Sequence, residues 1–409
     1  MIRGLAAVEL GGIADAVPRR RDRTQCRVER ALDLIQRRVI PGTQLAAYGH
    51  GDWNDSLQPA KPDMRERLCS SWTVTLNYQT LIALADALRR LGKTDRAAKL
   101  RALAAGILEE FQRVLIADDV LAGLAYFHEG GKTDLLLHPR DRATGLSYSV
   151  LAMIHAIITD MFTPQQAEAH LSLIRKHLLG PDGAHLFDRP MAYHGGLQKY
   201  FQRAESASFF GREIGIMYTH AHLRYCEALA HIGNAEEFFR ALSQINPIGI
   251  RELVPTATLR QANCYYSSSD AAFADRYEAF ADYDKVKRGE IALEGGWRVY
   301  SSGAGIGVRL IMQCFLGFRQ EMSALVVDPV IPAALDGLKV KIQLAGRPVE
   351  VTYNIKNKGC GPLSISVNGA NLDFIREQNP YRAGAARISM DAIVTRLTGK
   401  NDQLAVALG

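Results

Sequence analysis

The chain has 409 residues, 47% of them hydrophobic and 22% charged, which is typical of a globular protein that buries a large core. Its formal net charge of +6 is partly local to the arginine-rich residues 19–27, and no basic stretch interleaved with aromatics indicates a nucleic-acid-binding protein. No run of about 18 apolar residues predicts a membrane span, and residues 1–10 do not resemble a signal peptide, so we expect a cytoplasmic protein without nucleic-acid or membrane partners.

The cysteines are spread over the whole chain and include no C-x-x-C pair. This spacing argues against a zinc site and against a dense disulfide framework. Cys226 and Cys314 have apolar neighbours in the sequence, so we expect buried free thiols at these positions.

The first functional signal in chain order is a nine-residue segment that begins at Gly49 and reads Gly-His-Gly-Asp-Trp-Asn-Asp-Ser-Leu. Its glycines favour a loop over a helix interior. On such a loop the Trp53 indole can face a sugar ring, while the carboxyl group of Asp52 or Asp55 reaches a glycosidic oxygen. The alternative is a polar loop whose acids only cap the helix that starts near Asp63 or Trp72.

Apolar residues at helical spacing predict helices over most of the chain. One apolar stripe runs from Leu81 to Leu91 and ends at Gly92, and a second stripe runs from Leu100 to Val114. The link between them is short, so we expect these two helices to pack antiparallel.

Two further helices carry start or stop signals. Thr163 and Gln166 predict a capping box, with Pro164 at the first helical position. Another helix is expected from about Gly215 to His231, closed by the Gly-Asn pair that follows it. Helix pairs joined by short turns are typical of an α/α toroid.

Glu213 and His220 lie seven residues apart near the start of that last helix. On a continuous helix they would share one face, which would place a carboxylate beside an imidazole. The alternative is a helix surface on which both His220 and His222 are solvated.

Residues 301–307 are serines, glycines, an alanine and an isoleucine, and they lead into an apolar stretch. Backbone amides at such a helix start bind anions readily, and a glycine there permits close approach. The alternative is a close helix crossing that needs small residues. The run lacks the G-x-x-x-x-G-K-[ST] pattern, so it does not predict a nucleotide-binding loop.

The pattern changes to alternation after about Asp328. Apolar residues alternate with polar ones over 340–344, 349–355 and 363–367, and Asn368-Gly369 is typical of a hairpin turn. We expect a small antiparallel β domain here, with Pro329 and Pro332 at its boundary.

Three of these segments together resemble glycoside hydrolase family 94, the inverting sugar phosphorylases such as cellobiose and chitobiose phosphorylase. The first loop is similar to the family's G-D-W-N-D, and its wording looks most like the branch that acts on 1,2-β-oligoglucans. Residues 212–220, Arg-Glu-Ile-Gly-Ile-Met-Tyr-Thr-His, are similar to K-E-N-G-A-I-F-C-H, and residues 300–305 resemble R-T-G-T-A. The similarity runs from about Val28 to the C-terminal strands.

The resemblance implies roles for individual residues. Asp55 would be the general acid, and phosphate itself would attack the anomeric carbon, so no metal and no cofactor other than inorganic phosphate as co-substrate is expected. Substrate contacts are implied for Trp53, Asp52 and Glu213, and phosphate contacts for His220, Ser302 and Gly303.

The resemblance also implies a mainly α fold with a C-terminal β domain, in which a partial (α/α)6 toroid is followed by a small antiparallel β-sandwich. Residues 1–26 would be a poorly matched N-terminal segment, 27–322 the barrel portion with the catalytic loop, and 323–409 the β domain. Family members carry a β-sandwich and half of the barrel before that loop, so the chain resembles their C-terminal portion. A truncated gene product, a frameshifted reading frame and one half of a split protein stay open as explanations.

The expected function is therefore inverting phosphorolysis of β-linked gluco-oligosaccharides to glucose 1-phosphate, with little turnover from the chain alone. The expected partners are the oligosaccharide, phosphate, and either the remaining N-terminal half or a second copy of the chain. One alternative is an inverting hydrolase that uses Asp270 or Asp275 as a second carboxylate, about 6.5–9.5 Å from the first. The other alternative is a carbohydrate-binding remnant without activity.

Overall fold

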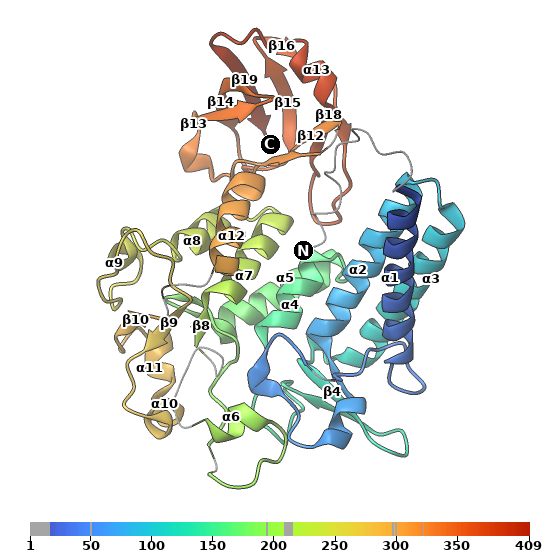
Figure 1. Cartoon of the computed structure of the whole chain (residues 1–409). Helices are drawn as coiled ribbons and strands as arrows, with labels where there is room; N and C mark the ends of the chain where they lie inside the picture. Colours follow the sequence, from blue (N-terminus) through green and yellow to red (C-terminus); the bar gives the residue numbers. More distant parts are fainter. Residues whose placement is uncertain are drawn as a thin grey trace.

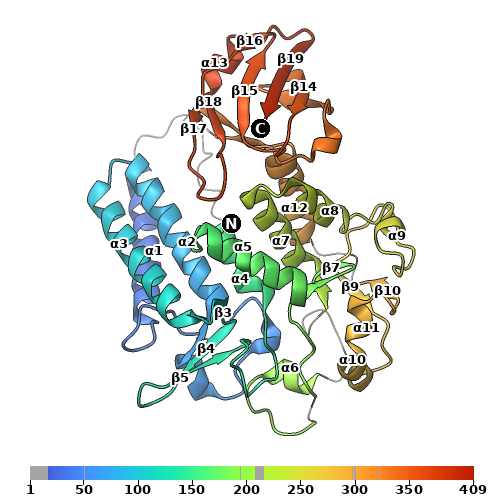
Figure 2. The ribbon, with the colours of Figure 1, turned by 180° about the vertical axis from the view of Figure 1, so that it is seen from behind.

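The computed structural model describes residues 17–49, 51–193, 195–207, 216–296, 298, 301–321 and 323–409. The chain folds into a mainly helical body with a β domain at one end (Figure 1, and from behind in Figure 2). The predicted combination of a helical part and a C-terminal β domain is confirmed. Among the described residues, no helix combines the length and the apolar character needed to cross a membrane.

The helices and the short helical turns, the latter labelled η, are α1 (Val17–Arg37), η2 (Asp55–Leu57), η3 (Pro62–Glu66), α2 (Ser71–Arg90), α3 (Thr94–Glu110), η4 (Phe111–Leu115), α4 (Val150–Ile158), α5 (Pro164–Leu173), η5 (Ile174–Leu178), α6 (Gln202–Ser206), α7 (Thr219–Ile232), α8 (Ala235–Ser243), α9 (Ile250–Leu253), α10 (Arg276–Asp282), α11 (Asp284–Lys287), α12 (Ser301–Leu310), η6 (Ile311–Phe315), η7 (Ala333–Leu335) and α13 (Met390–Val394).

The strands are β1 (Leu68–Ser70), β2 (Ile116–Ala117), β3 (Val120–Leu121), β4 (Leu124–Phe127), β5 (Thr133–Leu136), β6 (Leu179–Gly180), β7 (Gly183–Ala184), β8 (Met217–Tyr218), β9 (Ser268–Ala271), β10 (Leu293–Gly295), β11 (Phe318–Gln320), β12 (Ala324–Val327), β13 (Lys339–Leu344), β14 (Arg347–Ile355), β15 (Pro362–Val367), β16 (Ala370–Asn371), β17 (Ile375–Arg376), β18 (Ala386–Ser389) and β19 (Asp402–Leu408).

The predicted start and stop signals of the helices are confirmed. Gly92 adopts a positive φ directly after α2, and α2 packs along α3. The Thr163 hydroxyl accepts from the backbone N–H of Gln166, whose side chain accepts from the backbone N–H of Thr163, so the capping box is complete. Gly233 closes α7 in the left-handed conformation.

The helix expected from Gly215 begins later than predicted. Residues 217–218 form strand β8, which pairs with β9, and α7 starts at Thr219. Gly215 itself lies outside the described residues. The single continuous helix carrying both Glu213 and His220 is therefore wrong, because an extended strand separates their positions. Two residues that pair with a strand fifty positions away leave no periodic signal of their own.

Two consecutive helix pairs repeat one local structure, which we call the helix–hairpin unit. Helix α3 ends in the π-helical turn η4, and the hairpin β2–β3 follows it; α5 ends in the π-helical turn η5, and the hairpin β6–β7 follows it. The chain then returns as α4 after the first unit and as α7 after the second. Helices α2, α4, α7 and α12 pack in this order, each against the next.

The β domain consists of two sheets that enclose one apolar core. The sheets have the orders β11-β12-β18-β17 and β13-β14-β19-β15-β16, and residues from both, such as Val327 and Val351, share that core. The predicted hairpin at Asn368-Gly369 is present, with positive φ at both residues. One pair, β14 with β19, is parallel, so the domain is not purely antiparallel. Strand β11 belongs to its first sheet although it precedes residue 323, the boundary predicted from the sequence.

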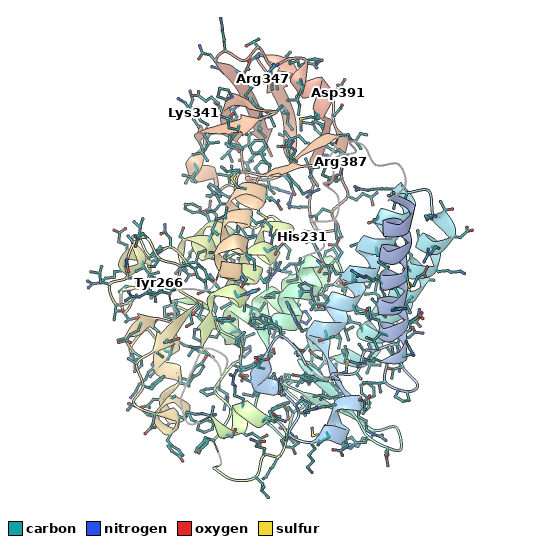
Figure 3. All side chains as sticks on the ribbon, viewed as in Figure 1. His231, Tyr266, Lys341, Arg347, Arg387 and Asp391 are labelled. Atoms are coloured by element: carbon teal, nitrogen blue, oxygen red, sulfur yellow. The ribbon has the colours of Figure 1, made fainter. Side chains whose placement is uncertain are left out.

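A loop of the β domain fastens it to the helical body at the end of α7. The carbonyl oxygen of His231 accepts from the side chains of Asn379 at 3.0 Å and Arg382 at 3.1 Å. Arg382 also donates to both carboxylate oxygens of Asp328, at 2.7 and 3.0 Å. Figure 3 shows His231 where the helical body meets this loop. The β domain thus contacts the C-terminal end of α7, and the candidate site lies at its N-terminal end.

Candidate active site

Asp52 fastens the acid loop, defined here as residues 51–60, to the start of α2. Its Oδ2 accepts from the hydroxyl of Thr73 at 3.2 Å, and its Oδ1 accepts from the backbone N–H of Asn54 at 3.3 Å. Thr73 lies in the first turn of α2, where its backbone N–H is capped by Ser70. Burial raises the pKa of Asp52, while hydrogen bonds from Ser70, Asn54 and Thr73 oppose that rise. Asp52 thus contacts a side chain in the first turn of α2, whereas the helix cap that the alternative interpretation expected of it is Ser70.

Trp53 packs the acid loop against the start of α7. Its ring centroid lies 5.2 Å from that of Tyr218, 5.3 Å from that of His220 and 6.3 Å from that of Trp72. Trp72 in turn packs at 4.6 Å against His155 of α4. The indole is half-buried in this cluster, so its position is set by three helices that are distant in sequence.

Asp55, in contrast, points to the outside of the loop. It begins the short helix η2, which Asn54 caps by accepting from the backbone N–H of Ser56 at 3.1 Å. The Asp55 side chain is 59% exposed, and its Oδ2 lies 4.0 Å from a guanidinium nitrogen of Arg203 on α6. A carboxyl group on a fixed turn, open to solvent and beside a cation, can meet a ligand directly.

His220 lies in the first turn of α7 with an unused polar atom. Its buried Nδ1 has no hydrogen-bond partner within the part of the chain that the structure describes. Burial, with a smaller contribution from the positive charge of Arg224, lowers the pKa of His220 to about 4. The imidazole is therefore neutral at pH 7 and can donate one hydrogen bond to a ligand oxygen.

Helices α7 and α12 start at the same end of the molecule. Gly307 of α12 lies beside Leu223 of α7, and two residues later Arg309 donates to Glu227 at 2.7 Å, so residue numbers rise in the same direction along both helices. The three-stranded sheet β10-β9-β8 lies before both starts, and the parallel course is visible in Figure 1. The backbone N–H groups of two first turns therefore face the same side.

Ser302 and Gly303 occupy the first turn of α12, as the small-residue run predicted. The Ser302 side chain is exposed, whereas Gly303 is buried. A Cβ on Gly303 would fall 1.8 Å from the hydroxyl oxygen of Tyr265. This glycine thus allows the close approach of Tyr265 to the helix start, and the contact is made by a loop residue rather than by the helix crossing that the alternative interpretation named.

The remaining candidate acids differ in placement. Glu213 lies outside the described residues. Asp275 caps α10, where it accepts from the backbone N–H groups of Tyr277 and Glu278, both at 2.9 Å. Asp270 on β9 accepts from the hydroxyl of Ser268 at 2.6 Å. Asp275 therefore has the helix-capping role that was the alternative to a catalytic base.

Sequence reasoning missed several residues of this site. Trp72 was read only as a helix start, and His155 and Arg203 were not singled out. Each reaches the site from a different helix, so no local spacing brings them together. The aromatic pair Tyr265-Tyr266 before β9 was the one local signal that could have indicated a site-facing loop.

Comparison with known proteins agrees with the motifs. Residues 317–406 match the family described as the glycoside phosphorylase C-terminal domain. The chain is 41% identical over 370 residues to the 1,2-β-oligoglucan phosphorylase of Listeria innocua serovar 6a, an alignment that covers 90% of this chain and 33% of that protein. It is 22% identical over 335 residues to the N,N′-diacetylchitobiose phosphorylase of Vibrio furnissii, with 80% and 37% covered.

A solved structure described as a sialidase matches with a TM-score of 0.52 and 12% identity, covering 88% of this chain and 30% of that one. This likeness concerns the fold alone. The chain spans about a third of the length of the curated relatives that it matches. The resemblance to the glycoside phosphorylases, drawn from three short motifs, is thereby confirmed across nine tenths of the chain.

Proposed function

We propose that this chain carries the phosphorolytic side of an inverting glycoside phosphorylase that acts on β-linked gluco-oligosaccharides, with 1,2-β-oligoglucans as the favoured substrate. The likeness to the 1,2-β-oligoglucan phosphorylase supports this substrate class. The products are glucose 1-phosphate and the shortened oligosaccharide. Inorganic phosphate is the co-substrate, and the reaction needs no other cofactor.

The observation that carries the proposal is the contact between Trp53 and His220, whose ring centroids lie 5.3 Å apart. It supports a site in which the acid loop and the starts of α7 and α12 face one ligand. Asp55 protonates the leaving glycosidic oxygen, and phosphate attacks the anomeric carbon from the opposite face. The C–O bond to the leaving sugar breaks as the C–O bond to phosphate forms.

The neutral His220 and the first turns of α7 and α12 hold the phosphate in this proposal. The unpartnered Nδ1 of His220 supports a hydrogen bond to a phosphate oxygen. Ser302 adds a hydroxyl from the exposed first turn of α12, and helix starts favour anions through their free N–H groups. Trp53, Asp52 and Glu213 remain the proposed sugar contacts.

The helical hairpins are proposed to be a sector of an (α/α)6 toroid, in line with the packing order α2, α4, α7, α12. The remaining helices would come from a preceding half or from a second copy of the chain. A cytoplasmic location is proposed as well, and six free cysteines fit a reducing compartment.

The test compares Asp55→Asn with Asp52→Asn in steady-state phosphorolysis of 1,2-β-gluco-oligosaccharides, using the chain alone or with an N-terminal part supplied. Loss of a general acid lowers kcat by about 10²–10⁴-fold, so Asp55→Asn should reach this range. Asp52→Asn should be milder, because the amide oxygen can still accept from Thr73.

Equal losses from the two variants would remove the assignment of Asp55 as the acid. Free glucose released without phosphate would replace phosphorolysis by hydrolysis, and binding without turnover would leave a carbohydrate-binding remnant.

A further inference from the structure

Arg276, the first residue of α10, is a buried cation whose hydrogen bonds go to backbone carbonyls. Its side chain donates to the carbonyl oxygens of Ala207 at 2.5 Å, Met191 at 2.7 Å and Ala204 at 2.9 Å. Only 2% of the residue is exposed. The guanidinium carbon also lies 5.3 Å from the ring centroid of Tyr193. One side chain thus grips three points that are 69 to 85 positions away in sequence.

The three carbonyls belong to one segment, residues 191–207, which we call the α6 segment. Met191 and Ala207 are its two ends, and Ala204 lies within helix α6. Glu205 ties the middle of the segment to itself by accepting from the backbone N–H groups of residues 199–201 at 2.6 to 2.8 Å. Arg276 therefore holds the ends of a segment whose residues 199–201 are bonded to Glu205.

The α6 segment is bonded directly to the acid loop. The backbone N–H of Gln202 donates to Gln58 at 2.9 Å, and its side chain donates to the carbonyl oxygen of Pro59 at 3.1 Å. In return the backbone N–H of Ala60 donates to Tyr200 at 2.8 Å. These three bonds follow within five residues of Asp55, so a displacement of α6 would be transmitted to the turn that holds the carboxyl group.

Burying a guanidinium group costs free energy, because the charged form loses its hydration. For the same reason, burial lowers the pKa of Arg276. Hydrogen bonds from a charged donor are stronger than neutral ones and offset this cost. Removing the donor would take this partner from the carbonyl oxygens of Met191 and Ala204, which are buried, and from that of Ala207, which is partly buried. The position therefore favours arginine, because a lysine ammonium is a compact charge and cannot spread its donors over the same fork.

We propose that Arg276 is a positioning residue that holds the α6 segment as a wall of the active site and so keeps Arg203 beside Asp55. This assignment rests on the proposed role of Asp55. Arg276 is mounted on a unit with its own small core, which includes Ile250, Tyr283 and Leu293. This unit lies next to the α6 segment and supports it through Arg276. Figure 1 shows α10 and α6 as neighbours at the end of the body opposite the β domain.

The experiment measures hydrogen–deuterium exchange of the full chain for Arg276→Lys and Arg276→Gln, with Arg288→Gln as a matched control. Arg288 lies in the same unit but is exposed, and its guanidinium group pairs with Glu290. Arg276→Gln should speed exchange in residues 55–60 and 191–207 by at least tenfold, whereas residues 318–327 and 386–389 of the β domain should be unchanged. Arg276→Lys should give a smaller increase in the same peptides, and Arg288→Gln none.

A chemical rescue separates positioning from general structural support. For Arg276→Ala, guanidinium ions at millimolar concentration should restore protection in the α6 segment, whereas sodium at the same ionic strength should not. In a form of the protein that turns over, Arg276→Lys should lower kcat with little change in KM for phosphate. Exchange that rises uniformly over the chain, or not at all, would overturn the proposal. Local loss of protection, together with no phosphorolysis by the wild-type chain even when the N-terminal part is supplied, would leave the clamp intact and refute only the proposed function.

Discussion

Within the acid loop, two carboxyl groups three positions apart occupy opposite environments. Asp52 is half-buried and bonded to the start of α2, whereas Asp55 is open to solvent beside Arg203. The sequence predicted the pair and its loop, because glycines and the intervening Trp53 are local features. It did not predict which acid is the less exposed one. That difference depends on Thr73, which bonds Asp52, and on Arg203 of α6, which lies beside Asp55 although it is more than a hundred residues further along the chain.

Three histidines near or within the helical core are predicted to make the chain sensitive to mild acid. Burial lowers the pKa of His155, His170 and His220 to about 4. In the unfolded chain they titrate near 6.5, so between pH 6.5 and 4 the unfolded state binds more protons than the folded state. Stability is then fully present above pH 6.5 and falls as the pH drops, by up to about 1.4 kcal/mol per pH unit for each histidine.

Urea unfolding at pH 7.5, 6.5, 5.5 and 4.5 measures this effect. His155→Gln, which cannot titrate, should flatten the dependence of the unfolding free energy on pH by about one proton. A free energy of unfolding that is the same at pH 7.5 and pH 5 would contradict the assignment of buried neutral histidines.

Among the helices and strands, boundaries with side-chain or glycine signals were predictable. The capping box of α5, the stop at Gly233 and the hairpin at Asn368 use local hydrogen bonds or positive φ angles, which the sequence encodes within four residues. Strands β8, β9 and β10 were not predicted, because they are short and pair only across long sequence separations. The start of α7 was consequently misplaced.

The first turns of α12 offer a matched pair of glycines. Gly303→Ala should destabilise the chain and weaken phosphate binding, because the new Cβ would collide with the Tyr265 ring. Gly305→Ala meets nothing within 4 Å and should stabilise the helix by about 0.5–1 kcal/mol. Thermal unfolding and calorimetric titration with inorganic phosphate measure both effects. If the two variants behaved alike, tight packing at Gly303 would not govern the helix start.

For the molecule as a whole, one outer face of α12 and η6 is apolar and open. Val308, Ile311 and Met312 follow each other at helical spacing, with 62%, 42% and 39% of their surfaces exposed. Contiguous apolar residues of this kind favour association. A partial toroid leaves the apolar flanks of its outermost helices without the neighbours that would cover them, but the location of this surface follows only from the orientation of α12.

The isolated chain is therefore predicted to self-associate and to show little turnover. Val308→Glu combined with Met312→Glu should shift the species observed by size-exclusion chromatography with light scattering towards the monomer. Leu259→Glu is the matched control, because Leu259 is the more exposed residue, at 84%, but belongs to a loop and not to α12 or η6. A wild-type chain that is monomeric at high concentration and turns over at a rate comparable to its relatives would contradict the prediction.

The repeated helix–hairpin units have a consequence for how the body unfolds. Each inner helix packs against the one before and the one after it, from α2 through α4 and α7 to α12. In such linear arrays stability is approximately a sum of intrinsic terms and nearest-neighbour couplings, as in a one-dimensional Ising chain. Fraying should accordingly start at the outermost repeats and spread inward, and the acid loop, which precedes α2, belongs to one of these outermost repeats.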